Sequence, residues 1–129
     1  MGDLARDFSR SEFRCHCGCG GDLVDGMLVD ALQRLRDRLG RPINILSGYR
    51  CPKHNAATKG SVPDSQHVLG RAADVTVLGM TPEQVAEAAK DIPEFKEGGI
   101  GVYDTFTHLD VRVTGLARWD NRKEGKRYA

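Results

Sequence analysis

The spacing of hydrophobic and polar positions predicts two helices. Between Asp25 and Leu39, apolar residues recur at helical spacing on one face: Leu28, Ala31, Leu32, Leu35 and Leu39. Asp25 can cap the start of this helix, and Gly40 followed by Pro42 ends it. A second helix is predicted over 82–90, because Thr81, Pro82 and Gln84 provide a capping box with proline at the first helical position. We expect both helices to pack on a hydrophobic core.

Four shorter segments predict strands, at 43–47, 71–77, 98–103 and 106–113, the last two joined by a turn at Asp104-Thr105. The pattern therefore predicts an α+β fold, with a small central antiparallel sheet of about four strands and two main helices against it. A long irregular segment separates the first two strands and runs to about Ser65, and 53–58 within it is expected to form a helical turn. A loop of this length in a small domain indicates a functional role.

Near the N-terminus, Ser9 and Glu12 have the spacing of a capping box for a short first turn, with Phe8 and Phe13 as its core anchors. The 129 residues predict a single domain, 1–129. Residues 1–24 form its Cys/Gly-rich N-terminal segment, and 114–129 form a basic tail. We expect the tail to be solvated, or alternatively to hold an anionic polymer weakly.

Composition narrows the class of partner. The net charge is +1, which does not favour nucleic-acid binding. No apolar run approaches 18 residues, so no transmembrane helix and no membrane partner are expected. The first residues carry charges and lack the apolar core of a secretion signal. The expectation is a protein made in the cytoplasm without a signal peptide.

The four cysteines are unevenly placed. Cys15, Cys17 and Cys19 alternate along one glycine-rich stretch, while Cys51 stands alone before Pro52. A disulfide within Cys-x-Cys would be strained, but any of the three can pair with Cys51 if the fold brings them together. Four thiols can also hold a structural zinc, although this is not the usual Cys-x₂₋₄-Cys spacing. We interpret them as structural, either a disulfide or a metal clip.

The candidate chemistry centres on His67 and Asp74, seven positions apart around Gly70. Imidazole and carboxylate are two side chains that bind zinc well. His108 lies on the last predicted strand and shares a face with Asp110, since side chains at i and i+2 point the same way. Three protein ligands with water completing the shell are typical of a catalytic zinc, which polarises a carbonyl and activates its water.

These residues also match a known family pattern. Ser65-x-His67-x-x-Gly70-x-Ala72-x-Asp74 followed by His108 resembles the M15 zinc peptidases. This family includes D-alanyl-D-alanine carboxypeptidases and dipeptidases and phage L-alanoyl-D-glutamate endolysins, with a hedgehog/DD-peptidase-like fold. The segment 47–50 resembles the family's sequence ahead of that motif, and 11–20 is similar, more loosely, to its small phage and prophage branch.

The resemblance implies one catalytic Zn²⁺ held by His67, Asp74 and His108. It further implies that Arg50 holds a substrate carboxylate or backbone oxygen, for which a forked guanidinium is suited. The alternative for Arg50 is a structural ion pair. Ser65 would support the site by hydrogen bonding, and Gly70 would let the backbone pass close to the metal.

The general base departs from the family pattern. Several relatives carry an acid three residues before the last histidine, where this chain has Thr105. Strand alternation favours Asp110 as the base, with Asp104 as the alternative. By alignment with relatives that end in His-x-His, Asp110 would instead bind zinc and His108 would assist catalysis.

The sequence thus predicts a monomeric zinc peptidase that hydrolyses peptidoglycan stem peptides, of the D-Ala-D-Ala carboxypeptidase or L-Ala-D-Glu endopeptidase type. The resemblance places it in phage or prophage lysis, acting on the cell wall after release. One alternative is a cell-wall-binding module that kept the zinc but lost hydrolysis. Another is a Cys-rich zinc module for nucleic acid, which predicts two zinc ions per chain and a basic face.

Overall fold

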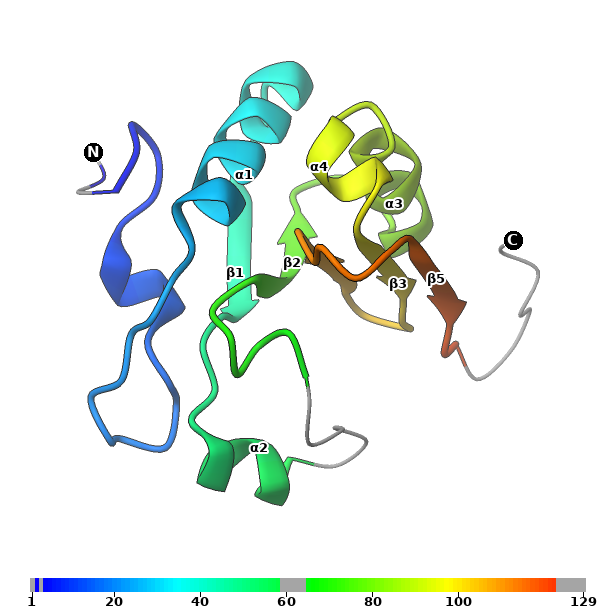
Figure 1. Cartoon of the computed structure of the whole chain (residues 1–129). Helices are drawn as coiled ribbons and strands as arrows, with labels where there is room; N and C mark the ends of the chain where they lie inside the picture. The colour runs from blue at the N-terminus through cyan, green and yellow to red at the C-terminus, as the bar shows by residue number, and fades with distance from the viewer. Residues whose placement is uncertain (1, 3, 59–64, 123–129) are drawn as a thin grey trace.

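The computed structural model describes residues 2, 4–58 and 65–122. Its strands are β1 (Ile43–Ser47), β2 (Ala72–Val77), β3 (Gly99–Val102), β4 (Thr107–Asp110) and β5 (Ala117–Asp120). Its helices are the 3₁₀ turn η1 (Arg10–Phe13) and α1 (Gly26–Leu39), α2 (Pro52–Ala57), α3 (Pro82–Ala89) and α4 (Pro93–Lys96). Figure 1 shows α1, α3 and α4 gathered at one end of the molecule and α2 at the other. The predicted α+β class is confirmed.

Both main helices begin and end as their sequences predict. The Asp25 side chain accepts a hydrogen bond from Met27 N at the start of α1, and Gly40, with φ 64°, ends the helix. Thr81 and Gln84 form the reciprocal capping box of α3. The predicted helical turn after Cys51 is α2, whereas α4, which follows α3 directly, was not predicted.

The sheet has the order β1-β2-β4-β3-β5. Pairs β1/β2, β2/β4 and β3/β4 are antiparallel, but β5 runs parallel to β3. The prediction of an antiparallel sheet of about four strands is therefore corrected to a mixed sheet of five. The predicted tail, 114–129, is not solvated throughout, because 117–120 forms the edge strand β5. Residues 123–129 of that tail lie outside the described residues.

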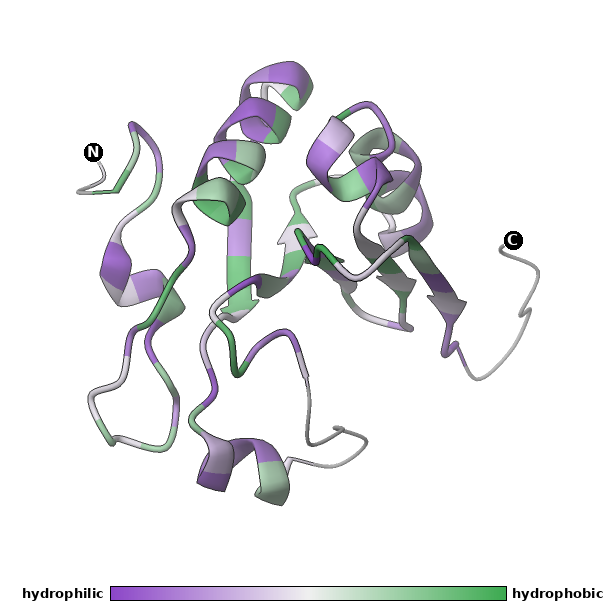
Figure 2. Cartoon of the chain, in the orientation of Figure 1, coloured by the Kyte–Doolittle hydropathy of each residue, from purple (hydrophilic) through white to green (hydrophobic). Residues whose placement is uncertain are grey.

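The core lies between the helices and the sheet. Leu28, Leu32 and Leu35 of α1 and Phe95 of α4 are fully buried, together with Leu109 of β4. In Figure 2 the hydrophobic positions of α1 alternate with hydrophilic ones along the helix, as expected for one buried face. Phe8 and Phe13 are buried in the same core, with ring centroids 6.3 Å apart, so the predicted anchors of the first turn are confirmed.

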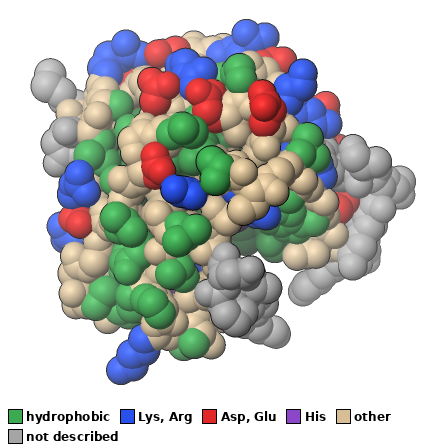
Figure 3. Space-filling model, in the orientation of Figure 1, with side chains coloured by type: hydrophobic (Ala, Val, Ile, Leu, Met, Phe, Trp, Pro, Cys, Tyr) green, Lys and Arg blue, Asp and Glu red, His purple; other side chains and the backbone are tan. Residues whose placement is uncertain are grey.

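Charge is mixed on the face shown in Figure 3, where basic and acidic side chains lie next to one another and hydrophobic side chains gather below them. Within the described residues, no helix is both long and apolar enough to cross a bilayer. Part of the irregular segment before Ser65, residues 59–64, lies outside the described residues.

Candidate metal centre

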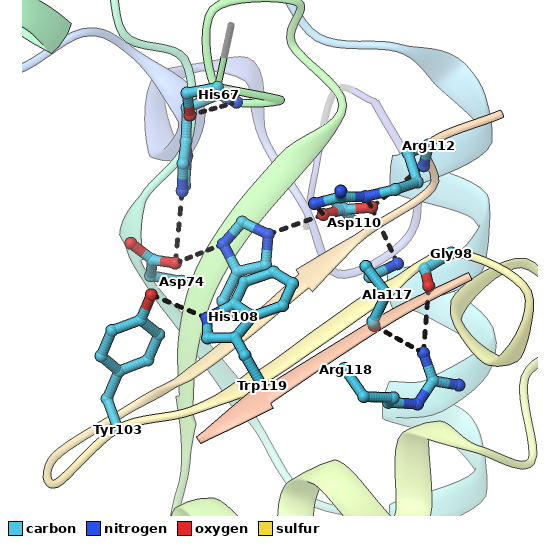
Figure 4. A network of polar contacts seen from close by, with 12 residues as sticks. His67, Asp74, Gly98, Tyr103, His108, Asp110, Arg112, Ala117, Arg118 and Trp119 are labelled. Atoms are coloured by element: carbon cyan, nitrogen blue, oxygen red, sulfur yellow. Dashed lines mark hydrogen bonds and ion pairs between the residues drawn. The ribbon is translucent and has the colours of Figure 1, made fainter. Parts of the chain in front are cut away.

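The sheet register brings the candidate ligands into one row. Asp74 of β2 lies directly opposite His108 of β4, and His108 lies opposite Gly101 of β3. On the far side of Gly101, the row ends at Trp119 of β5. Because residues in register share a sheet face, the row places a carboxylate, an imidazole and an indole side by side. Figure 4 shows this arrangement.

His67 reaches the row from the turn that precedes β2. The turn bends at Gly70, whose φ of 70° favours glycine, and a Cβ there would meet the carbonyl oxygen of Leu23 at 2.7 Å. The glycine at position 70 is therefore required by a close approach of the Leu23 backbone. Ser65 Oγ accepts a hydrogen bond from His67 N at 3.2 Å, as the supporting role predicts.

Each imidazole has one nitrogen directed at Asp74 and the other held by an acceptor. Nε2 of His67 lies 3.3 Å from Asp74 Oδ1, and its Nδ1 lies 2.7 Å from the carbonyl oxygen of Gly48. Nδ1 of His108 lies 3.1 Å from the same Asp74 oxygen, and its Nε2 lies 2.7 Å from Asp110 Oδ2. Acceptors that hold the outer nitrogen fix the tautomer of a metal-binding histidine. Both rings therefore direct their inner nitrogen at Asp74, where a metal would replace the hydrogen bond.

The three predicted ligands form a buried cluster. One ligand atom each from His67, Asp74 and His108 can be chosen so that all lie within 4.8 Å of one another. The three residues are 1%, 7% and 6% exposed. Two imidazoles and a carboxylate at this spacing fit the donor set of a zinc with three protein ligands.

Electrostatics in the cluster keep the acid ionised. Burial raises the pKa of Asp74, but hydrogen bonds with His108 and His67 outweigh it and hold that pKa well below its usual range. Burial lowers the pKa of His108, yet Asp110 and Asp74 raise it above its ordinary value. In the absence of metal, the cluster therefore favours a proton on His108 and a charge on Asp74.

Arg50 borders the cluster. Its Nη2 lies 3.5 Å from Asp74 Oδ2, and its Nη1 donates to Asn55 Oδ1 at 3.1 Å. Arg50 is 9% exposed. The alternative of a structural ion pair is thus present in the structure, and the guanidinium also lies beside the ligands, where a substrate group would be held.

Asp110 lies on the outer side of His108, away from Asp74 (Figure 4). Asp110 and His108 lie on the same face of β4, as strand alternation predicts, but Asp110 is fully buried. Its oxygens also accept hydrogen bonds from Gly99 N and from the backbone and guanidinium of Arg112. Together with the bond to His108, these hydrogen bonds saturate the carboxylate. The structure therefore favours a role for Asp110 in positioning His108 over the predicted role as general base. Nor does Asp110 belong to the converging ligand atoms.

Asp104 lies in the turn between β3 and β4 and is exposed. Its charge interacts with Arg122 on the segment after β5. Hydrogen bonding with Asp120 raises the pKa of the Arg122 guanidinium, and Glu83 and Asp104 add smaller contributions. The Asp104 carboxylate is therefore open to water, unlike that of Asp110.

Two glycines and an indole complete the site and were not predicted. A Cβ on Gly99 would lie 2.2 Å from Asp110 Oδ2, and a Cβ on Gly101 would lie 2.3 Å from the Trp119 ring. Trp119 is 4.9 Å from His108 between ring centroids, and its Nε1 donates to the Tyr103 hydroxyl at 3.0 Å. The signal that could have revealed them is the Gly-x-Gly alternation at 99–101, which leaves one face of a strand without side chains.

The four cysteines converge elsewhere, around the loop after η1 and the start of α2. All four are free thiols, and one sulfur from each lies within 4.8 Å of the others. The fold thus brings Cys51 next to the alternating three, and no disulfide joins them in this structure.

Comparison with known proteins supports the reading of the motif. Curated proteins provide no match to the chain. Comparison with protein families matches residues 6–110 to the family described as Peptidase M15. The match covers most of the chain and includes His67, Asp74, His108 and Asp110, so the protein belongs to the Peptidase M15 family.

Proposed function

We propose that this protein is a zinc-dependent peptidase that hydrolyses the stem peptides of peptidoglycan. The observation that supports it best is the cluster of His67, Asp74 and His108, in which both imidazoles present a nitrogen whose opposite ring atom is held by an acceptor. Such outer hydrogen bonds are characteristic of metal-binding histidines. Membership of a peptidase family gives the cluster its reaction class.

Zinc is the metal that this donor set suits, because it accepts imidazole and carboxylate ligands in a four-coordinate shell with one position for water. When bound, zinc would polarise the scissile carbonyl and lower the pKa of a water to about 7. His67 would bind through Nε2 and His108 through Nδ1, with Asp74 supplying the carboxylate.

The remaining roles belong to groups around the ligands. Arg50 would orient a carboxylate or carbonyl of the peptide, since its guanidinium already lies next to Asp74. Asp110 would hold the His108 ring, and Asp104, an exposed acid in the turn before β4, is then the remaining candidate for the general base. The deciding comparison is Asp104→Asn against Asp110→Asn: loss of turnover with zinc retained is expected for the first, and loss of zinc affinity for the second.

The bond that is cut would be D-Ala-D-Ala or L-Ala-D-Glu, the two types that M15-like sequences suggest. We propose a monomer that acts on the cell wall after release, in phage or prophage lysis. Purified peptidoglycan incubated with the zinc-loaded protein should release fragments whose masses identify the bond. Release of single D-alanine indicates a carboxypeptidase, and release of peptides from the glycan indicates an endopeptidase. Fragments that His67→Ala releases equally well would contradict the proposal.

A second function is a zinc-containing cell-wall-binding module without hydrolysis. It is favoured by Thr105, which stands where several M15-like sequences carry an acid, and by the hydrogen-bonded carboxylate of Asp110. Sedimentation with intact peptidoglycan separates the two functions. Binding with one zinc in the His67 cluster and no released fragment would establish the module and exclude the peptidase.

A further inference from the structure

The four cysteine sulfurs are arranged at distances that suit a metal. Sγ of Cys17 lies 3.4 Å from Sγ of Cys15 and 3.5 Å from Sγ of Cys51. A tetrahedral zinc with sulfur ligands at about 2.3 Å has sulfurs about 3.8 Å apart, whereas a disulfide requires about 2.05 Å. The observed separations are close to the edge of the tetrahedron and far from a covalent bond.

Backbone N–H groups point at the sulfurs. Cys51 N donates to Sγ of Cys15 at 3.4 Å, and Gly21 N donates to Sγ of Cys19 at 3.3 Å. His54 N donates to Sγ of Cys51 at 3.4 Å, in the first turn of α2. Hydrogen bonds to metal-bound sulfur offset the negative charge of thiolates and orient them. The sulfurs of Cys15, Cys19 and Cys51 each have such a donor.

The loop that carries Cys15, Cys17 and Cys19 is shaped to turn around one point. Cys15 N donates to the carbonyl oxygen of Gly21 at 2.7 Å and closes the loop. Gly18 and Gly20 have φ of 85° and 82°, a conformation that L side chains rarely adopt. The left-handed backbone at these two glycines therefore allows three sulfurs within five residues to converge.

We propose that Cys15, Cys17, Cys19 and Cys51 bind one zinc ion as a four-thiolate structural site. Four sulfur ligands close the coordination shell, which leaves no position for water and excludes a catalytic role for this ion. The site is separate from the His67 cluster and takes no substrate. Its ligands come from the N-terminal segment and from the start of α2, so the ion would join the two.

The joined segment carries contacts of the His67 cluster. The Gly48 carbonyl oxygen holds His67 Nδ1, Tyr49 N donates to Phe13 O at 2.9 Å, and Arg50 N donates to His67 O at 3.2 Å. Cys51 is the next residue. A four-thiolate zinc would thus fix the backbone that orients His67 and Arg50. Binding of the ion to the four cysteines does not depend on the peptidase activity proposed above. Only its effect on the orientation of His67 and Arg50 rests on that proposed function.

Metal content of the purified full chain tests the proposal. We expect two zinc ions per chain in the parent protein, one in His67→Ala and one in Cys17→Ser/Cys19→Ser. His54→Ala is the matched control, because it removes the imidazole three residues after Cys51 and keeps the backbone N–H that donates to the Cys51 sulfur; it should retain two ions. Loss of an ion in this control would overturn the four-cysteine ligand set.

A spectroscopic readout independent of activity identifies the ligands. Cobalt added to the reduced, metal-free protein should produce thiolate-to-cobalt charge-transfer absorption that persists in His67→Ala and disappears in the double cysteine variant. If that variant does not fold, stepwise modification of the thiols in the parent protein decides: release of one zinc per four thiols supports the site. One zinc per chain with no charge-transfer band, iron in place of zinc, or a mass reduced by the hydrogens lost to disulfides would overturn it.

Discussion

Asp110 Oδ2 lies 2.7 Å from Nε2 of His108, while the opposite nitrogen of the same ring faces Asp74. A charged carboxylate at this distance accepts a hydrogen bond from the Nε2–H group, so that Nδ1 is the ring nitrogen that would bind a metal. Burial raises the pKa of Asp110, but the hydrogen bonds from His108 and Arg112 outweigh it and hold that pKa well below its usual range. The carboxylate that positions His108 thus stays charged at neutral pH.

Replacing Asp110 by Asn should therefore weaken zinc binding. The amide of asparagine has only one acceptor oxygen in place of the two of the carboxylate. The His108 ring therefore loses the partner that fixes its tautomer. We expect zinc affinity and peptidase activity to fall by about 10- to 100-fold, the usual effect of removing an outer partner of a metal ligand. Zinc affinity is measured by competition with a chromophoric chelator.

The chain contains a matched control. Asp120 accepts hydrogen bonds from the backbone N, Nε and Nη2 of Arg122 at 3.0, 3.0 and 2.6 Å, in the same Asp-x-Arg geometry as Asp110 and Arg112. Asp120 ends β5 opposite Val102, whereas Asp110 is hydrogen-bonded to His108. Asp120→Asn should leave zinc affinity unchanged. An equal loss in both variants would show that the effect comes from the Asp-x-Arg pair and not from His108.

A methyl group on Gly99 should affect zinc binding without touching a ligand. Its Cβ would lie 2.2 Å from Asp110 Oδ2, so Gly99→Ala must displace the carboxylate that holds His108. We expect a loss of about 1–3 kcal/mol in the free energy of unfolding, typical of overpacking, and a zinc affinity reduced about 10-fold. Thermal denaturation and chelator competition measure the two effects. Gly26→Ala, with open space around its Cβ, is the control and should alter neither.

Local sequence signals predicted the elements whose determinants lie within a few residues. Asp25 and Thr81 cap their helices as expected, and the four predicted strands are present with slightly different bounds. The edge strand β5 was missed because 117–120 is short and lies in a charged stretch, and its pairing with Gly99–Val102 is long-range and parallel. Such pairing depends on the rest of the sheet and leaves little local signal.

The same distinction applies to the site. His67, Asp74 and His108 could be predicted because their residue types bind zinc and their spacing matches a known motif. The environment of Asp110 could not, because it depends on Gly99 N across the sheet and on the rotamer of Arg112. Strand alternation gives the face on which a carboxylate lies, but not the groups that saturate it.

Zinc affinity should decrease as the pH falls, and the decrease should begin above pH 6.5. Zinc requires neutral imidazole, and contacts with Asp110 and Asp74 raise the pKa of His108 above its ordinary 6.5 despite burial. Below that raised pKa, zinc must therefore displace a proton from His108. The affinity of the His67 cluster, taken as the uptake of the parent chain minus that of His67→Ala, should increase between pH 6 and 8. A constant affinity over this range would contradict the raised pKa.

The stability of the metal-free protein should respond to pH with the opposite sign. Protonated His108 has a raised pKa in the folded state, so its stabilisation is complete below its unfolded value of about 6.5 and is lost as the pH rises through the folded pKa. The pKa values of Asp74 and Asp110 are lowered, so the stability that these residues contribute is lost only in acid, below their ordinary pKa of 3.8. In chelator, the melting temperature should fall as the pH rises above 6.5. In Asp110→Asn this fall should be smaller, and an unchanged fall would contradict the role of Asp110.

The only tryptophan of the chain should report on the cluster. Trp119 lies 4.9 Å from His108 between ring centroids, across the gap that Gly101 leaves in β3. A protonated imidazole in contact with an indole quenches its fluorescence, so zinc that displaces the His108 proton should increase the emission of Trp119 at pH 6.5. Zinc titration of the metal-free protein followed by fluorescence measures this increase. In His67→Ala the increase should vanish even though the cysteine ligands remain. An unchanged response in that variant would place its source outside the His67 cluster.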